Sequence, residues 1–131
     1  MLQHDYLLEV IQQFVQTISN ALQRALEEHD EVAVGQVESA VGELLQLDAD
    51  TAMSLAPESL VTMMMLAGTG DAVSGYVAYA LNKLAIAYDG MGKAELAQER
   101  REQAQAVADA FGADVNEVPE ELRAVDARIS G

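Results

Sequence analysis

Cysteine is absent from this chain of 131 residues. Its absence excludes disulfide bonds, thiolate metal sites and cysteine nucleophiles. Aromatic residues are also scarce, at 5% of the chain, and tryptophan is missing. Half of the residues are hydrophobic and many of these are alanine, the best helix former. We therefore expect a core built where helices approach closely, because the large rings that fill other cores are few.

Basic residues are few as well. Lysine and arginine together number 7, against 22 aspartates and glutamates, which gives a formal net charge of −15. Binding to nucleic acid or to an anionic membrane relies on clustered cations, so we expect neither as a partner. A solvated acidic surface that keeps the chain soluble explains the charge, and a specific basic partner is the alternative.

Long apolar runs are missing too. No stretch approaches the roughly 20 apolar residues that span a bilayer. The N-terminus lacks the basic segment and the small-residue cleavage site of a signal peptide. A cytoplasmic location is therefore expected.

Hydrophobic residues recur at helical spacing over most of the chain, and no strand pattern is found. We predict an all-α fold of about five to six helices in one domain over residues 1–112. Residues 113–131 are expected to form a linker followed by a short helix or a frayed tail. The main predicted helices cover residues 7–26, 31–47, 57–67, 72–88 and 93–111.

The first predicted helix has a wide apolar face. Its residues form a stripe and a flank: Leu7, Ile11, Phe14, Ile18, Ala21 and Ala25, with Leu8, Val15 and Leu22. One neighbouring helix cannot cover such a face, so either two helices of the same chain flank it or part of it contacts a second subunit.

Two glycines stand inside the second predicted helix. Gly35 and Gly42 lie two turns apart on one side, with Ser39 between them. A glycine in a helix interior costs about 1 kcal/mol relative to alanine. The pair indicates that another backbone passes close to this side of the helix.

The last two long helices carry the most specific pattern. It consists of Leu81, Leu84, Ala85 and Tyr88, then Gly92, then Ala97 and Ala104. This spacing resembles one tetratricopeptide repeat, in which small residues sit where two antiparallel helices touch. Arg101 departs from the pattern, because the repeat has a bulky apolar residue there. Either its aliphatic stem packs while its head reaches solvent, or the helix has turned away from the usual geometry.

The chain as a whole resembles a family of small bacterial helical proteins that carries only a domain-of-unknown-function label. The resemblance covers residues 2–111 and rests on DYLLEVIQQ at residues 5–13, on LLQLD at residues 44–48 and on the helix pair at residues 88–104. It implies a tetratricopeptide-like fold and a bacterial origin. The family has no established activity, so the resemblance carries over no catalytic residue.

Motifs that would indicate catalysis or metal binding were not found. Neither His4 nor His29 has a glutamate three residues before it, as a di-iron bundle requires. The glycines at residues 68–75 have neither the preceding strand nor the lysine of a phosphate-binding loop. We expect no cofactor, no metal and no enzymatic activity.

A binding face is predicted on the helix at residues 72–88, where tetratricopeptide proteins line their groove. Its residues are Tyr79, Asn82, Ile86 and Asp89, and an ordinary contact with the preceding helix is the alternative. Residues 63–65 are three methionines that point around one helix, and we expect Met64 to be a further contact. Methionine adapts to varied partners.

The leading hypothesis is thus a non-enzymatic module that binds a peptide or protein partner in a helical groove. One alternative is a structural homodimer formed through the first helix. Another is a helical bundle that binds a small molecule.

Overall fold

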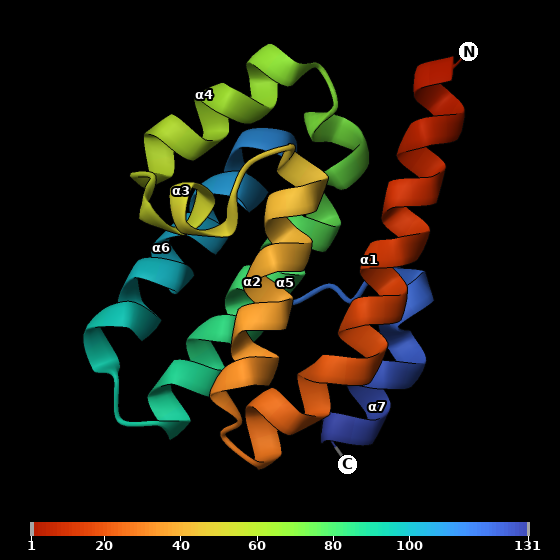
Figure 1. Cartoon of the computed structure of the whole chain (residues 1–131). Helices are drawn as coiled ribbons and strands as arrows, with labels where there is room; N and C mark the ends of the chain where they lie inside the picture. Colours follow the sequence, from red (N-terminus) through yellow and green to blue (C-terminus); the bar gives the residue numbers. More distant parts are fainter. Residues whose placement is uncertain (1, 131) are drawn as a thin grey trace.

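The computed structural model describes residues 2–130, with side chains described for residues 6–129. Within this range the chain is helical and the expected all-α class is confirmed (Figure 1). Its elements are α1 (Leu2–Glu27), α2 (Glu31–Leu45), α3 (Ala49–Ser54), α4 (Pro57–Ala67), α5 (Gly70–Gly90), α6 (Ala94–Phe111), the 3-10 turn η1 (Glu120–Leu122) and α7 (Arg123–Ser130).

Local sequence signals explain several helix ends. The Asp30 carboxylate accepts hydrogen bonds from the backbone N–H groups of Val32 and Ala33, at 2.9 and 3.4 Å, and so caps the start of α2. Pro57 opens α4, where its missing N–H group costs nothing. Gly112 ends α6 with a φ of +70°, a left-handed conformation that glycine adopts readily.

Helix α5 lies at the centre of the molecule. It forms a hairpin with α6, and α1 and α2 form a second hairpin that packs against it. Residues 77–81 of α5 are all buried, which means that neighbours cover every side of the helix there. Helix α4 contacts both α5 and α6, and α7 contacts α1. The fold is therefore organised around one enclosed helix.

The helix pair predicted from the repeat pattern is present. Leu84, Ala85 and Tyr88 on α5 are buried, and so are Ala97 and Ala104 on α6. Gly92, with a φ of +77°, lies in the short turn between the two helices. The likeness of this pair to a tetratricopeptide repeat, and the stacking of several such pairs, stay predictions.

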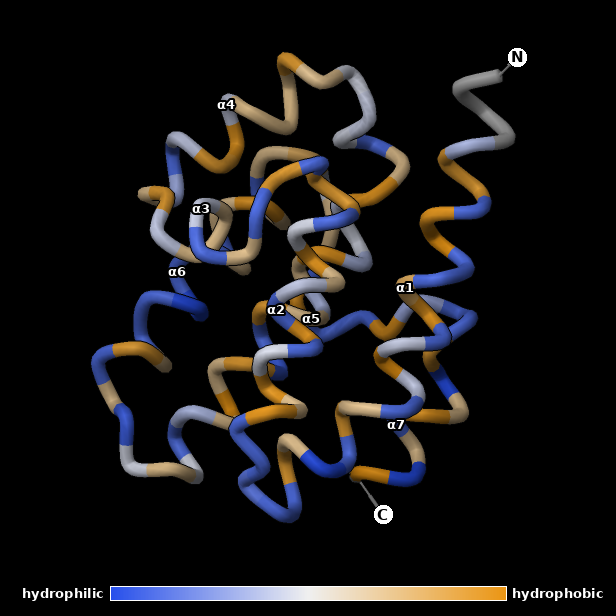
Figure 2. The backbone as a smooth tube through the Cα atoms, viewed as in Figure 1, coloured by the Kyte–Doolittle hydropathy of each residue, from blue (hydrophilic) through white to orange (hydrophobic). Residues whose placement is uncertain are grey.

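The wide face of α1 is covered along only part of its length. Phe14, Ile18 and Leu22 are buried by helices of the same chain. Nearer the N-terminus, Tyr6 and Leu8 are 54% and 48% exposed. Hydrophobic residues recur along the part of α1 that carries colour in Figure 2, so part of its apolar face stays open to solvent.

The C-terminal residues belong to the packed unit, which corrects the boundary expected at Gly112. Leu122 and Val125 are 0% and 4% exposed and are part of the hydrophobic core. A short helix follows the linker, and this helix, α7, runs beside α1 in Figure 1. Leu122, Val125 and Ile129 repeat at helical spacing, and this stripe turns α7 toward the core.

The expectation for the two glycines of α2 is correct at one position and wrong at the other. A Cβ atom on Gly42 would stand 2.6 Å from the carbonyl oxygen of Leu47 and 3.3 Å from the backbone nitrogen of Ala49. At Gly35 the same atom would meet nothing within 4 Å. Close backbone approach is therefore confined to the turn that leads into α3.

This contrast predicts opposite effects of the same substitution. We expect Gly42→Ala to lower the free energy of unfolding by about 1–3 kcal/mol, because the new methyl group overlaps fixed backbone atoms. Gly35→Ala should raise it by about 0.5–1 kcal/mol, since alanine favours the helix and meets open space. Urea unfolding of both variants checks this. Equal effects of the two substitutions would contradict the geometry.

Candidate functional site

The binding face predicted on α5 is partly covered by the chain itself. Tyr79 is only 3% exposed, and its hydroxyl donates a hydrogen bond to Asp126 Oδ1 on α7 at 2.9 Å. Lys83 Nζ lies 3.1 Å from the same oxygen and 5.4 Å from the centre of the Tyr79 ring. Tyr79 is therefore not open to a partner, and that prediction is corrected.

A second tyrosine of α5 holds the segment just before α7. The Tyr76 hydroxyl donates a hydrogen bond to Glu121 Oε2 at 2.7 Å. Its ring meets the Phe14 ring edge to face, with centroids 5.9 Å apart. Two tyrosines and Lys83 thus bind one acid of η1, Glu121, and one acid of α7, Asp126.

The other predicted residues of α5 differ in their surroundings. Asn82 is half-buried and Ile86 is 48% exposed, so both reach the surface. Asp89 is exposed and pairs with Arg101 Nη1 at 2.6 Å. This pair explains the departure from the repeat pattern, because the Arg101 head lies at the surface while its helix stays packed on α5.

Among the three methionines, the residue predicted to contact a partner is the buried one. Met64 is 2% exposed, whereas Met63 and Met65 are 40% and 57% exposed. Leu66 follows them at 81% exposed. The prediction for Met64 is corrected, because its side of α4 faces the core and its neighbours face outward.

A buried polar pair on α6 was missed by sequence reasoning. Arg100 and Gln103 are 3% and 2% exposed. Arg100 Nη1 donates to the Met53 carbonyl at 2.8 Å and to Gln103 Oε1, and Gln103 Nε2 donates to the Leu55 carbonyl at 2.9 Å. A cation at the C-terminal end of α3 is favourable for the helix dipole. The pair therefore fastens α3 to α6.

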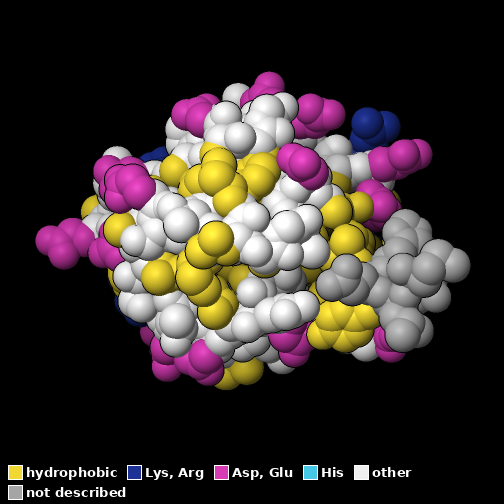
Figure 3. All heavy atoms as spheres, turned by 90° about the horizontal axis from the view of Figure 1, so that it is seen from above, with side chains coloured by type: hydrophobic (Ala, Val, Ile, Leu, Met, Phe, Trp, Pro, Cys, Tyr) yellow, Lys and Arg dark blue, Asp and Glu magenta, His cyan; other side chains and the backbone are white. Residues whose placement is uncertain are grey.

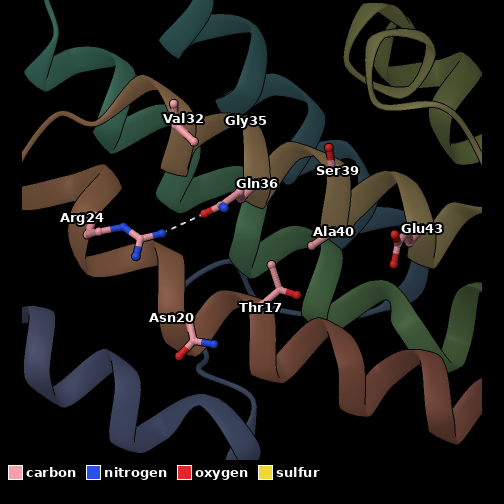
Figure 4. Close-up of a pocket in the computed structure, with 9 residues that line it drawn as sticks. All are labelled: Thr17, Asn20, Arg24, Val32, Gly35, Gln36, Ser39, Ala40 and Glu43. Atoms are coloured by element: carbon pink, nitrogen blue, oxygen red, sulfur yellow. Dashed lines mark hydrogen bonds between the residues drawn. The ribbon is translucent and has the colours of Figure 1, made fainter.

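An open groove lies between α1 and α2, and the sequence did not predict it. It has a volume of about 880 Å³. Figure 4 shows its walls, which come from the two helices of the first hairpin. Its lining is Thr17, Asn20 and Arg24 from α1, with Val32, Gly35, Gln36, Ser39, Ala40 and Glu43 from α2.

Charge and hydrogen-bonding capacity are spread along this groove. Arg24 and Glu43 lie toward opposite ends of it (Figure 4). Arg24 Nη2 donates to Gln36 Oε1 across the groove at 2.8 Å, and Arg24 Nε lies 3.8 Å from Asp30 Oδ2. Arg24 carries further N–H groups that a bound carboxylate or carbonyl could accept from. The groove is therefore polar, with a cationic and an anionic end.

The sequence contained a usable signal for this groove. Gly35, Ser39 and Ala40 follow one another at helical spacing, and small residues leave space beside a helix. Because Gly35 was interpreted as a close backbone contact, an open space beside it was not predicted from the sequence.

Three further findings concern metal binding, membrane-spanning helices and similarity to known proteins. Among the described residues, no group of three or more histidines, aspartates or glutamates is placed to hold a metal ion. Over residues 2–130, no helix combines the length and apolarity needed to cross a membrane. Comparison with protein-family models, with curated proteins and with solved structures found no match. The resemblance to a bacterial helical family therefore stays a prediction.

The three tyrosines of α5 all have a raised pKa. Burial, with a hydrogen bond to Glu121, raises the pKa of Tyr76 from 10.0 to about 12. Burial and a bond to Asp126 raise the pKa of Tyr79. Burial and the 2.6 Å bond from the Tyr88 hydroxyl to Glu38 raise the pKa of Tyr88. In each case the neutral phenol is favoured by the folded state.

These shifts predict a loss of stability in alkali. Each phenol holds its proton more tightly when the chain is folded, so its contribution is complete below pH 10 and is lost as the pH rises from 10 toward 12. We expect the free energy of unfolding, measured with urea, to fall over this range. Tyr76→Phe should make the fall less steep. A flat profile to pH 12, with all phenols ionising near 10, would contradict the hydrogen-bonded geometry.

Proposed function

We propose that the protein is a non-enzymatic interaction module, located in the cytoplasm, that binds a peptide segment of a partner protein in the groove between α1 and α2. The observation that carries this proposal is the polar lining of that groove. Thr17, Asn20 and Ser39 supply donors and acceptors from both walls. A peptide backbone presents both kinds of group along its length and needs partners for them.

The dimensions of the groove suit a short segment. Val32 and Glu43 mark its ends on α2, which at about 1.5 Å per residue gives a length of roughly 16 Å. An extended chain rises about 3.3 Å per residue, so about five residues fit. The charged ends set a direction, with an acidic residue near Arg24 and a basic residue near Glu43.

A photo-crosslinking experiment tests this proposal. A photoreactive amino acid replaces Ser39, in the groove, or Gln105, an exposed residue of α6. We expect the Ser39 position to capture a partner that the Gln105 position does not. With that partner purified, Ser39→Arg should weaken binding at least about tenfold, because the long side chain fills the groove and loses a hydrogen-bonding group. Gln105→Arg should leave binding unchanged.

Equal capture at the two positions would count against the groove. So would an affinity that Ser39→Arg leaves intact while the variant stays folded by circular dichroism.

A self-associating homodimer is a second candidate, because apolar side chains stay exposed at one end of the molecule. Tyr6 and Leu8 belong to the open part of α1, and Met63, Met65 and Leu66 belong to α4. The N-terminal end of α1 and helix α4 lie at the same end in Figure 1. Seen from that end, Figure 3 shows hydrophobic side chains gathered inside a rim of acidic ones. Apolar groups that cluster in this way favour an interface.

Light scattering at micromolar concentration tests the dimer. The expected dimer mass should fall to that of a monomer in Leu8→Glu, because the substitution places a charge in the apolar contact. Gln12→Glu adds the same charge at an exposed polar position of α1 and should leave the dimer intact. A wild-type monomer at these concentrations would exclude this candidate.

A further inference from the structure

The amphipathic segment made of η1 and α7 packs against both α1 and α5, and we call the surface that it covers the α1–α5 groove. Leu122 and Val125 are the buried anchors, and Ile129 packs partly against the core. These residues follow one another at spacings of three and four, which places them on one face of the segment. The groove is therefore shaped to receive apolar side chains from a helix.

The polar groups of this groove favour a segment that carries carboxylates. On the groove side the groups are the Tyr76 and Tyr79 hydroxyls, which act as donors, and the Lys83 ammonium. On the segment side they are the carboxylates of Glu121 and Asp126. Lysine and arginine number only 7 in the whole chain, against 22 acidic residues. The Lys83 ammonium therefore distinguishes this groove from most of the acidic surface. A segment that replaced α7 would need carboxylates at the same places.

Helix α7 is held in a way that allows replacement. It has 8 residues, and helices much shorter than about 12 residues are marginal by themselves in water. Residues 113–119, which join it to α6, contain no helix. Segments at a chain terminus open locally at a lower free energy than the core, without unfolding of the whole molecule. Such opening would uncover Tyr76, Tyr79 and Lys83 while the hairpin of α5 and α6 persists.

From these contacts we infer that the α1–α5 groove is a binding surface for an acidic amphipathic helix of another protein, and that α7 occupies it until such a partner displaces it. The partner carries apolar residues at the spacing of Leu122, Val125 and Ile129, and carboxylates where Glu121 and Asp126 lie. This surface is separate from the groove between α1 and α2, so either proposal can fail without the other. Because residues 113–119 keep α7 attached, its effective concentration at the groove is in the millimolar range. A partner must bind tightly enough to compete with it.

A peptide experiment on the full-length chain tests the inference. The first probe is a fluorescently labelled peptide of residues 118–131, and its affinity is measured by fluorescence anisotropy. Leu122→Ala in the chain weakens the hold on α7, so the unmodified peptide should bind at least about tenfold more tightly than it binds wild type. The same substitution in the peptide should weaken its binding to that variant chain at least about tenfold. If Leu122→Ala strengthens peptide binding when it is in the chain and weakens it when it is in the peptide, α7 and the peptide compete for the same groove.

Control variants locate the binding. In the Leu122→Ala chain, Lys83→Met should weaken peptide binding about tenfold, because the cation that meets Asp126 is lost. Lys93→Met removes a lysine that pairs with Glu31 on another surface and should change nothing. Should Leu122→Ala fail to fold, Asp126→Asn weakens the same contact without removing an apolar anchor and gives the same comparison.

A second probe identifies the partner class. It is an unrelated acidic peptide with the same apolar spacing and carboxylate positions, and a scrambled version is its control. We expect the patterned peptide to bind the opened variant and the scrambled one not to bind. If only the chain's own tail peptide binds, the groove serves the tail alone and the inference is overturned. It is equally overturned if the opened, folded variants bind no peptide more tightly than wild type does.

Discussion

Enclosure of α5 is the constraint on which the rest of the structure depends. Around residues 77–81 neighbouring segments cover it on every side, and alanines line many of the helix contacts, including Ala78 and Ala80 on α5 and Ala97 and Ala104 on α6. Polar groups that are buried on such a helix need hydrogen-bond partners within the molecule. Its three tyrosines meet this need by donating to carboxylates of other segments, which are α2, η1 and α7. The same hydrogen bonds therefore join the central helix to α2 and to the C-terminal segment made of η1 and α7.

Much of the fold could be predicted from helical periodicity and from the prolines and glycines that mark helix ends. The proline at residue 57 and the glycine at residue 112 mark helix ends where expected, and the spacing of Tyr88, Ala97 and Ala104 identified the α5–α6 pair. The role of residues 113–131 could not be predicted, because η1 and α7 are too short to give a strong periodic signal. Their place depends on contacts made far along the chain, such as the one between Tyr79 and Asp126.

The candidate sites were harder to predict for a related reason. Helical spacing tells which residues share a face, but it does not tell which neighbour covers that face. Tyr79 and Met64 were placed on plausible faces and proved to be buried, whereas Ile86 lies at the surface. The α1–α2 groove escaped notice because Gly35 fits an open space as well as it fits a close contact. Arg100 and Gln103 lie on the buried side of α6. Their burial could not be predicted from the sequence, because their hydrogen-bond partners are backbone carbonyls at the end of α3.

Native-state hydrogen exchange measures the enclosure of α5 most directly. Backbone amides of residues 77–81 should exchange only through global unfolding, and their rates should follow the free energy of unfolding measured with urea. Amides of α7 should exchange at least about 100-fold faster, because that helix opens while the central helix stays covered. Exchange of α7 as slow as that of residues 77–81 would contradict a displaceable C-terminal helix. Fast exchange within residues 77–81 would contradict the enclosed helix itself.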